Sequence, residues 1–231
     1  MLKRIQRLMP EMEAQITTCT ICGYKGVFSP VFGHTAIRMR AECPQCGSRE
    51  RHRMIKWCID QNLELQALGD LLHFAPEKAL GALVRQYCSR YITADLDEGR
   101  ADLVLNMEVL DLEDNSLDTV MANHVLEHLD DAKALGKLFR VIRPGGRALL
   151  TFPVIYGMPE TYEDPSINTP ALRHRHYGQS DHVRYYGRDV DDRIAGAGFR
   201  LEKIVASGAA VADFAFSPGE TLYIANVPEA A

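Results

Sequence analysis

The chain has 231 residues, of which 46% are hydrophobic and 25% charged, with a formal net charge of −5, a composition ordinary for a soluble globular protein. Its length suffices for one α/β domain and a small module. No apolar run reaches the roughly 18–20 residues of a membrane helix, and the N-terminus lacks a signal peptide's apolar stretch, so we expect a cytoplasmic protein outside the membrane.

The charge is distributed unevenly along the chain. Residues 1–56 hold ten Lys or Arg and four Asp or Glu, a net charge of +6, whereas the remainder carries −11. A basic head on an acidic body indicates either an anionic partner or two modules that attract each other.

Four of the six cysteines form two C-x-x-C pairs, Cys19 with Cys22 and Cys43 with Cys46, and a glycine follows each pair. Such a turn directs two thiolates at one point, and two turns complete a closed S₄ site of the kind that binds structural zinc. A disulfide is disfavoured in the cytoplasm, and a redox C-x-x-C would not need a second copy. We therefore predict a zinc ribbon over residues 1–47, stabilised largely by its metal.

Within this ribbon, residues 27–28 and 36–40 are expected to form short strands around turns at residues 29–30 and Gly33. His34 could in principle also bind the metal, but four thiolates already fill the site.

Residues 48–62 have helical spacing, with Ser48 as the expected N-cap, and residues 48–68 are interpreted as a basic linker. Arg49, Arg51 and Arg53 lie in the first turns, where the helix dipole disfavours cations. Either these arginines form a solvated basic face, or an anionic group compensates their charge. Two candidates for that anionic group stay open. One is a carboxylate or phosphate of a substrate, bound by Arg51 and Arg53. The other is a set of acidic residues in a later loop: Glu160, Glu163 and Asp164.

From residue 70 on, short apolar runs alternate with helical patterns. Strands are expected at 70–74, 91–94, 101–105, 117–122, 147–152, 199–206 and 220–226, and helices at about 78–88, 131–142 and 190–197. This alternation predicts an α/β fold with a doubly wound parallel sheet and helices on both faces. Ligands of such sheets bind at the carboxyl ends of the strands. Asp95, which ends the second strand, suits the two hydroxyls of a ribose.

Residues 111–153, which include NHVLEH and RPGG, resemble the class I S-adenosylmethionine (SAM)-dependent methyltransferases of the ubiquinone/menaquinone type. Five further segments resemble a bacterial subgroup with an N-terminal C-x-x-C pair: CPQCGSRERHR, LHFAPE, ADLD, YEDPSI and YGQSDHVRYYGRD. The resemblance covers residues 19 to about 200. It implies a Rossmann-like, seven-stranded, mostly parallel sheet over residues 69–231, preceded by the zinc ribbon.

The resemblance also implies which residues bind SAM. In the turn after the first strand, Ala75 stands at the first position of the family's G-x-G and Glu77 lies near the second, where its carboxylate could pair with a positive charge of SAM. Asp95 would bind the ribose, and Asn106 and Met107 would flank the adenine. The full expected set is His73, Ala75, Glu77, Asp95, Asn106, Met107 and Asn123. Loss of SAM binding is the alternative that the altered G-x-G leaves open.

The string from His124 to His128 also matches the H-x-x-E-H metalloprotease motif. We reject that interpretation, because the string belongs to the methyltransferase pattern and no third ligand follows it. A divalent-ion site that uses Glu127 and His128 stays as a minor alternative.

Residues 154–187 form a long polar insertion after the fifth strand, and such insertions often act as lids. Methyl transfer is an in-line displacement in which the enzyme aligns its substrates and excludes water. A hydroxyl acceptor must also lose a proton, and histidine is suited to accept it. The expected catalytic residues are His124, His182 and Asp181, and the expected acceptor-binding residues are Arg51, Arg53, Tyr177, Arg184 and Tyr185.

The leading hypothesis is a methyltransferase that acts on an oxygen or nitrogen of a small molecule, such as a sugar or a biosynthetic intermediate, with an anionic acceptor as one option. An RNA methyltransferase is a rival, supported by the basic head but opposed by the acidic body. A second rival is a non-catalytic module whose ribbon binds a protein partner. The sequence leaves the oligomeric state open.

Overall fold

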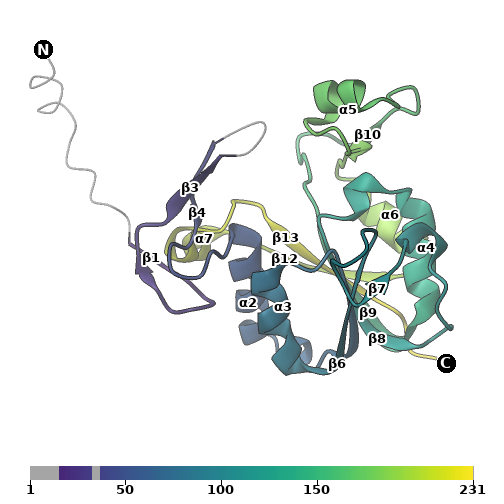
Figure 1. Cartoon of the computed structure of the whole chain (residues 1–231), viewed down its shortest axis with the longest axis horizontal. Coiled ribbons are helices and arrows are strands. Elements are labelled where there is room, and N and C mark those ends of the chain that lie inside the picture. The colour runs from purple at the N-terminus through teal and green to yellow at the C-terminus, as the bar shows by residue number, and fades with distance from the viewer. Residues whose placement is uncertain (1–15, 33–36, 231) are drawn as a thin grey trace, which may run out of the picture.

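The computed structural model describes residues 16–32 and 37–230, and Figure 1 shows a central sheet with helices on either side. The sheet has seven strands in the order β12-β13-β9-β8-β5-β6-β7. Their bounds are β5 Gly69–Phe74, β6 Cys88–Asp95, β7 Leu103–Val104, β8 Leu117–Asn123, β9 Ile142–Thr151, β12 Arg200–Val205 and β13 Thr221–Asn226. β5, β6, β7, β8 and β9 pair in parallel, whereas β13 is antiparallel to β9 and to β12. The predicted seven-stranded, mostly parallel α/β sheet is confirmed.

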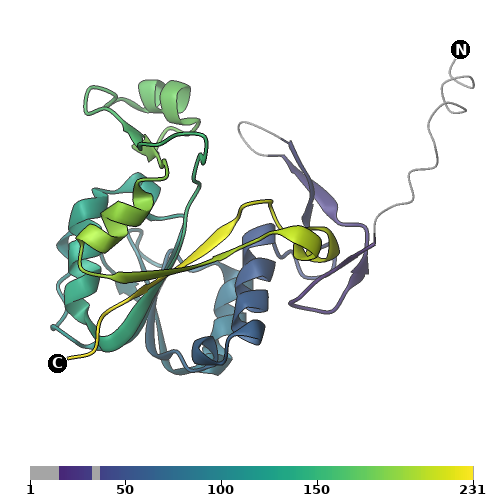
Figure 2. The same ribbon diagram turned by 180° about the vertical axis from the view of Figure 1, so that it is seen from behind.

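Two hydrophobic clusters cover the two faces of this sheet. One face packs against α2 (Glu50–Gln61), α3 (Lys78–Val84) and α7 (Gly208–Phe214), and the other against α4 (Asp131–Val141) and α6 (Val190–Gly196). Figure 2 shows α6 and α7 from behind, at opposite sides of the strands. Central strands such as β8 are buried on both faces, which explains why they read as nearly continuous apolar runs. No helix among the described residues is long and apolar enough to cross a membrane.

Helix α2 differs from the expected linker in two ways. It begins at Glu50 with Arg49 as its N-cap, so the prediction of Ser48 as the N-cap is wrong. Its apolar face, which includes Met54 and Ile55, lies in one hydrophobic cluster with β5, β8 and β9, so the helix is part of the core that covers the sheet. The pattern of four apolar residues in two turns explains this burial.

The described part of the N-terminal unit forms two hairpins, β1 (Thr17–Thr18) with β2 (Lys25–Gly26) and β3 (Ser29–Phe32) with β4 (Ile37–Glu42). The prediction of a strand at residues 27–28 and a turn at 29–30 is wrong, because residues 29–30 begin β3. A proline is tolerated there since a two-stranded hairpin leaves an outer edge that needs no N–H donor. Phe28 is instead buried beside Cys19 and Cys43. Gly33, His34 and the start of the predicted second strand lie outside the described residues.

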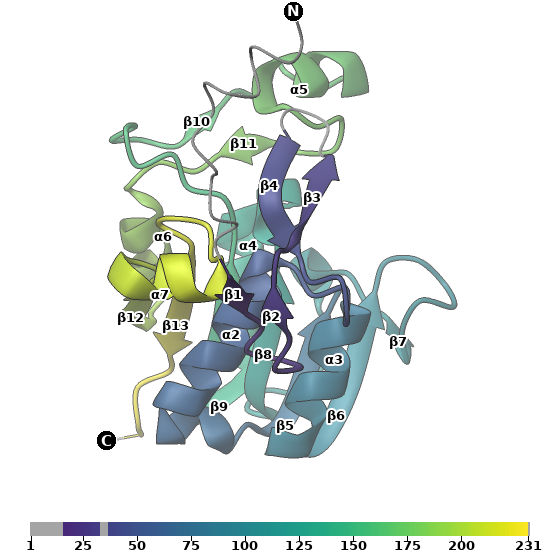
Figure 3. The same cartoon turned by 90° about the vertical axis from the view of Figure 1, so that its left-hand side faces the viewer.

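The insertion after β9 has secondary structure of its own: β10 (Tyr162–Glu163), α5 (Pro170–Tyr177) and β11 (Arg184–Tyr185). β10 pairs with β11, and the segment stands above the carboxyl ends of the strands, as Figure 3 shows from the side. The remaining elements are short 3₁₀ turns: η1 Leu63–Gln66, η2 Arg85–Tyr87, η3 Met107–Val109 and η4 Leu126–His128.

Candidate active site and cysteine cluster

A cavity of about 550 Å³ lies where β5, β6 and β8 end. This is the edge at which doubly wound sheets bind ligands. Five sequence-predicted residues line it, each from a separate segment of the chain: Ala75, Asp95, Met107, His124 and Asp181. The rest of its lining is Phe74, Leu96, Arg100, Leu105, Val125, His128, Leu129 and Arg173. We refer to it as the donor cavity.

The turn after β5 owes its shape to the backbone of Ala75. This residue has φ 46°, a left-handed conformation that glycine adopts far more readily than alanine, and its N–H donates to Ala94 O at 2.8 Å. The altered G-x-G therefore keeps the bend of a glycine turn. His124 has φ 54° and donates to Thr151 O at 2.8 Å. Two strained residues thus face one cavity, which is typical of functional sites.

Asp95, the last residue of β6, is an acidic residue that lines the donor cavity. Its Oδ1 accepts a hydrogen bond from Asp97 N at 3.0 Å, which orients the carboxylate. Asp97 itself is exposed and pairs with Arg100 at 3.1 Å. Of the two carboxylates, Asp95 is therefore the one that lines the donor cavity.

Met107 is buried and, with Leu96 and Leu105, forms an apolar wall of the donor cavity. Such a wall suits the flat face of a purine base.

Three residues that were expected to bind SAM do not line the donor cavity, and their side chains make contacts within the protein. Asn106 accepts from Glu108 N at 2.8 Å and caps η3, and Asn123 is buried and accepts from Thr151 Oγ1 at 3.1 Å. His73 is fully buried with its Nδ1 2.8 Å from the Tyr91 hydroxyl, and burial lowers the pKa of His73 to about 4. Asn106 and Asn123 each use their side-chain oxygen in these contacts, and direct binding of SAM by the three residues stays a prediction.

Glu77 is bound by the chain itself. Arg51 Nε donates to Glu77 Oε2 at 3.1 Å, and His52 Nε2 lies 2.8 Å from the same oxygen. Burial alone would raise the pKa of Glu77, but the hydrogen bonds from His52 and Arg51 outweigh it and lower the pKa to about 2. The expected pairing of Glu77 with a positive charge of SAM is thus replaced by an internal ion pair.

Arg53 is fully buried and donates to four carbonyl oxygens. Two precede α2, Ala41 O at 3.1 Å and Ser48 O at 2.7 Å, and two lie at the C-terminal end of α7, Phe214 O at 3.0 Å and Ala215 O at 2.7 Å. The prediction that Arg53 binds the acceptor is wrong, because its donors are used where substrate has no access.

The alternative that acidic residues of the insertion compensate the arginines of α2 is also wrong. Arg49 pairs with Glu42 at 2.8 Å, and Arg51 pairs with Glu77. Glu163 of the insertion instead accepts from Arg184 Nε at 2.8 Å and from Arg193 Nη2 at 2.6 Å.

The insertion residues expected to bind the acceptor are used to hold the insertion together. Arg184 is buried and also donates to Leu129 O at 2.6 Å, and the buried Tyr177 accepts from Asp164 N at 3.0 Å. Tyr185 packs against Tyr177 with ring centroids 6.1 Å apart. Arg173, from α5, reaches the donor cavity instead. In the sequence, Arg173 belongs to a run of basic residues, and nothing distinguishes it from its neighbours there.

The expected catalytic residues gather around the turn that follows β8. His124 Nδ1 lies 3.1 Å from Glu127 Oε1, and Asp181 Oδ2 lies 3.4 Å from His128 Nδ1. His182 is buried with its ring 4.7 Å from that of His128. His124 and Asp181 thus face the donor cavity, while His182 stands behind it.

A second cavity, of about 190 Å³, lies on the other side of His124. Besides His124, the lining includes Tyr156, Glu220 and Thr221. Burial raises the pKa of Glu220, against the opposing effect of His124 and Arg51. We refer to this space as the acceptor cavity, and His124 is the side chain that it shares with the donor cavity.

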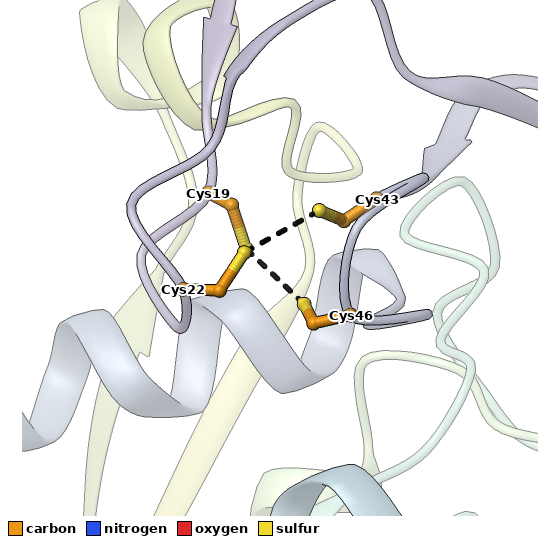
Figure 4. A group of neighbouring side chains, drawn as sticks. All are labelled: Cys19, Cys22, Cys43 and Cys46. Atoms are coloured by element: carbon orange, nitrogen blue, oxygen red, sulfur yellow. Dashed lines mark hydrogen bonds between the residues drawn. The ribbon is translucent and has the colours of Figure 1, made fainter.

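Figure 4 shows the four predicted zinc ligands facing one another. Cys19 Sγ lies 3.7 Å from Cys46 Sγ and Cys22 Sγ lies 3.7 Å from Cys43 Sγ, with all four sulfurs within 4.8 Å of one another. Tetrahedral zinc with Zn–S bonds of about 2.3 Å requires sulfurs about 3.8 Å apart, so the donor set and its spacing fit the ion. The Oγ of Ser48 lies 3.4 Å from Cys19 Sγ and 3.2 Å from Cys46 Sγ, which is the position it takes instead of the N-cap.

Comparison with known proteins gives one family. Residues 76–150 match the model of the methyltransferase domain family. A 70-residue segment is 36% identical to an uncharacterized 37.1 kDa protein in transposon TN4556 of Streptomyces fradiae, and it covers 30% of this chain but only 20% of that protein.

Among solved structures, the YcgJ protein of Bacillus subtilis aligns with a TM-score of 0.53 and 14% identity over 78% of this chain and all of that one. A SAM-dependent methyltransferase of Archaeoglobus fulgidus aligns with a TM-score of 0.50 and 16% identity over 75% of this chain and 93% of that one. The [4+2]-cyclase SpnF aligns with a TM-score of 0.53 and 15% identity over 78% and 82%. At such identities the likeness describes the fold.

Proposed function

We propose that this chain, which matches a methyltransferase domain over residues 76–150, is a SAM-dependent methyltransferase that methylates an oxygen or nitrogen atom of a small-molecule acceptor. The observation that carries the proposal is the position of His124 between two cavities. In-line transfer requires donor and acceptor on opposite sides of one reacting methyl group.

The donor cavity fits SAM in its size and in its polar and apolar groups. Asp95 would accept hydrogen bonds from the ribose hydroxyls, and Met107 would pack against the adenine. The left-handed turn at Ala75 would let the backbone approach the methionine part. When bound there, SAM supplies a methyl group on a positively charged sulfur.

The acceptor cavity is small, which favours a small acceptor or one reactive arm of a larger molecule. His124 would remove or hold the proton of an acceptor O–H or N–H group. Its ring is oriented by Glu127 Oε1 at 3.1 Å, so the base faces the cavity in one orientation. Glu220 places a carboxyl group in the same space, where it would bind a hydroxyl or amine of the acceptor.

The internal pairing of the basic residues argues against RNA as the acceptor. Arg53 and Arg51 were the expected phosphate contacts, and both are bound to other groups of the chain. We further propose that Cys19, Cys22, Cys43 and Cys46 hold a structural zinc ion, and that the ribbon positions α2 rather than binding substrate.

The proposal is tested by separating donor binding from turnover. His124→Ala should keep the SAM dissociation constant within about threefold and lower methyl transfer by about 10²–10⁴-fold. The control His174→Ala changes an exposed histidine of α5 and should alter neither quantity. Transfer of labelled methyl groups is measured on a panel of small alcohols and amines and on total RNA. Labelling of RNA alone would overturn the acceptor class, and a SAM dissociation constant above the millimolar range would contradict the donor site.

A further inference from the structure

Three potential metal ligands converge beside the donor cavity. Glu127 and His128 belong to the turn η4 after β8, and His182 comes from the insertion, just before β11. Each offers one ligand atom, and these atoms all lie within 4.8 Å of one another. His182 is thus a third potential ligand beside Glu127 and His128 of the H-x-x-E-H string, although it lies far from them in the sequence.

Two of these side chains have buried polar atoms without a partner among the described residues. They are Oε2 of Glu127, a residue 1% exposed, and Nδ1 of His182, a residue 4% exposed. A buried donor or acceptor left without a partner costs about 1–3 kcal/mol, more for a charged group. A bound cation would satisfy the carboxylate oxygen and an imidazole nitrogen together.

We propose that Glu127, His128 and His182 bind one divalent transition-metal ion of the zinc type, separate from the ion of the ribbon. Two imidazoles and one carboxylate favour zinc or a similar ion over magnesium, which prefers oxygen ligands. Three protein ligands leave a coordination position open, as in catalytic rather than structural sites.

The surrounding contacts hold these ligands in place. Val183 N donates to Glu127 O at 2.9 Å, and Arg184 Nη1 donates to Leu126 O at 3.3 Å, so the two residues that follow His182 are fastened to η4 directly beside the ligands. Asp181 Oδ2 lies 3.4 Å from His128 Nδ1, and His124 holds the other oxygen of Glu127. Carboxylate contacts to a ligating histidine orient the ring and strengthen metal binding.

His128 lines the donor cavity, so an ion at this site would lie next to the reacting groups. Its open position would take an oxygen of the acceptor, and a metal-bound hydroxyl loses its proton more readily. That role rests on the proposed function, whereas the binding of the ion does not.

The test is a titration of the full-length protein with Zn²⁺ after the ribbon has been saturated with one equivalent. We expect a second equivalent, measured by calorimetry or against a chromophoric chelator. His128→Gln and His182→Gln should each weaken this second event at least about tenfold, because each removes one of three ligands. His174→Gln, an exposed histidine of the same insertion, is the matched control and should bind the second equivalent as the wild type does.

A wild-type protein that binds a single equivalent would overturn the proposal, whatever the variants do. So would a second equivalent that keeps its affinity in both variants. Replacing Zn²⁺ by Co²⁺ adds an independent readout, since the second equivalent should lack the thiolate-to-cobalt absorption of the ribbon. Neither SAM nor an acceptor is present, so these results do not depend on whether the proposed methyl transfer is found.

Discussion

The guanidinium of Arg51 and the carboxylate of Glu77 form a two-point ion pair in which Nε donates to Oε2 at 3.1 Å and Nη2 binds Oε1. Arg51 lies in the first turn of α2, and Glu77 is the N-cap residue of α3. A cation that the dipole of α2 disfavours is thus neutralised by a residue of the turn that shapes the donor cavity. The pair connects the ribbon side of the molecule to that turn.

Glu77→Gln should lower the free energy of unfolding at pH 7 by about 2–3 kcal/mol, since the pKa of Glu77 falls from 4.5 to about 2 on folding. A carboxyl whose pKa is lowered stabilises the fold above its unfolded pKa and loses this contribution as the pH falls through the folded value. The wild type should therefore lose stability between pH 4.5 and about 2, and the variant should lack this component. Urea unfolding across this range measures both. The control Asp60→Asn removes a surface pair with Lys56 and should cost under about 1 kcal/mol.

Arg53→Met should lower the free energy of unfolding by about 3 kcal/mol or more, because it leaves buried carbonyls without donors at about 1–3 kcal/mol each. Arg49→Met is the matched control, since Arg49 pairs with Glu42 at the surface and its loss should cost under about 1 kcal/mol. Denaturant unfolding at neutral pH compares the two. Equal effects would contradict the role of Arg53 as the bond between the ribbon and α7.

Cys43→Ser should remove one tightly bound zinc equivalent, measured by elemental analysis of the purified protein. The melting temperature should fall as well, because the ribbon shares Arg53 with the residues after α7. Cys88→Ser is the control, since this half-buried thiol contacts Val84 O far from the ribbon, and it should keep the ion. Full zinc content in Cys43→Ser would exclude the four-cysteine site.

Asp95→Ala should weaken SAM about 10- to 100-fold or more, because hydrogen bonds from a ribose to a carboxylate contribute about 1.5–3 kcal/mol each. Asp97→Ala is the control, as the exposed Asp97 pairs with Arg100 but does not itself line the donor cavity, and its effect should stay within about threefold. Calorimetric titration with SAM measures both. The opposite order of effects would show that the wrong carboxylate has been assigned.

Ala75→Gly should change the free energy of unfolding by less than about 1 kcal/mol, because relief of the left-handed strain is offset by the greater freedom of glycine in the unfolded chain. Ala75→Val should cost about 1–3 kcal/mol and weaken SAM, since a β-branched residue is strained at this φ and extends into the donor cavity. Thermal melts with and without SAM test the pair. Ala79→Val, in the helix that follows, controls for the added volume. SAM binding by Ala75→Val at wild-type strength would contradict the assigned turn.

The sequence by itself determined the features that depend on local periodicity or spacing. Alternating apolar runs and helical patterns predicted the parallel sheet, because a strand buried on both faces needs apolar residues throughout. The two C-x-x-C turns predicted the cysteine cluster, since each turn alone directs two thiolates at one point. The position of Asp95 was predicted for the same reason, as it is the last residue of a strand.

Only the tertiary structure decided what the charged residues do. Arg53 was expected at a substrate but meets Ala215, which follows α7, a helix that the sequence analysis did not anticipate. His182 lies beside Glu127, although the insertion has no pattern that sets its distance from η4. Such partners are chosen by packing between segments distant in the chain. A buried charge pairs with a group that the fold brings close to it, and local spacing in the sequence does not specify which group that is.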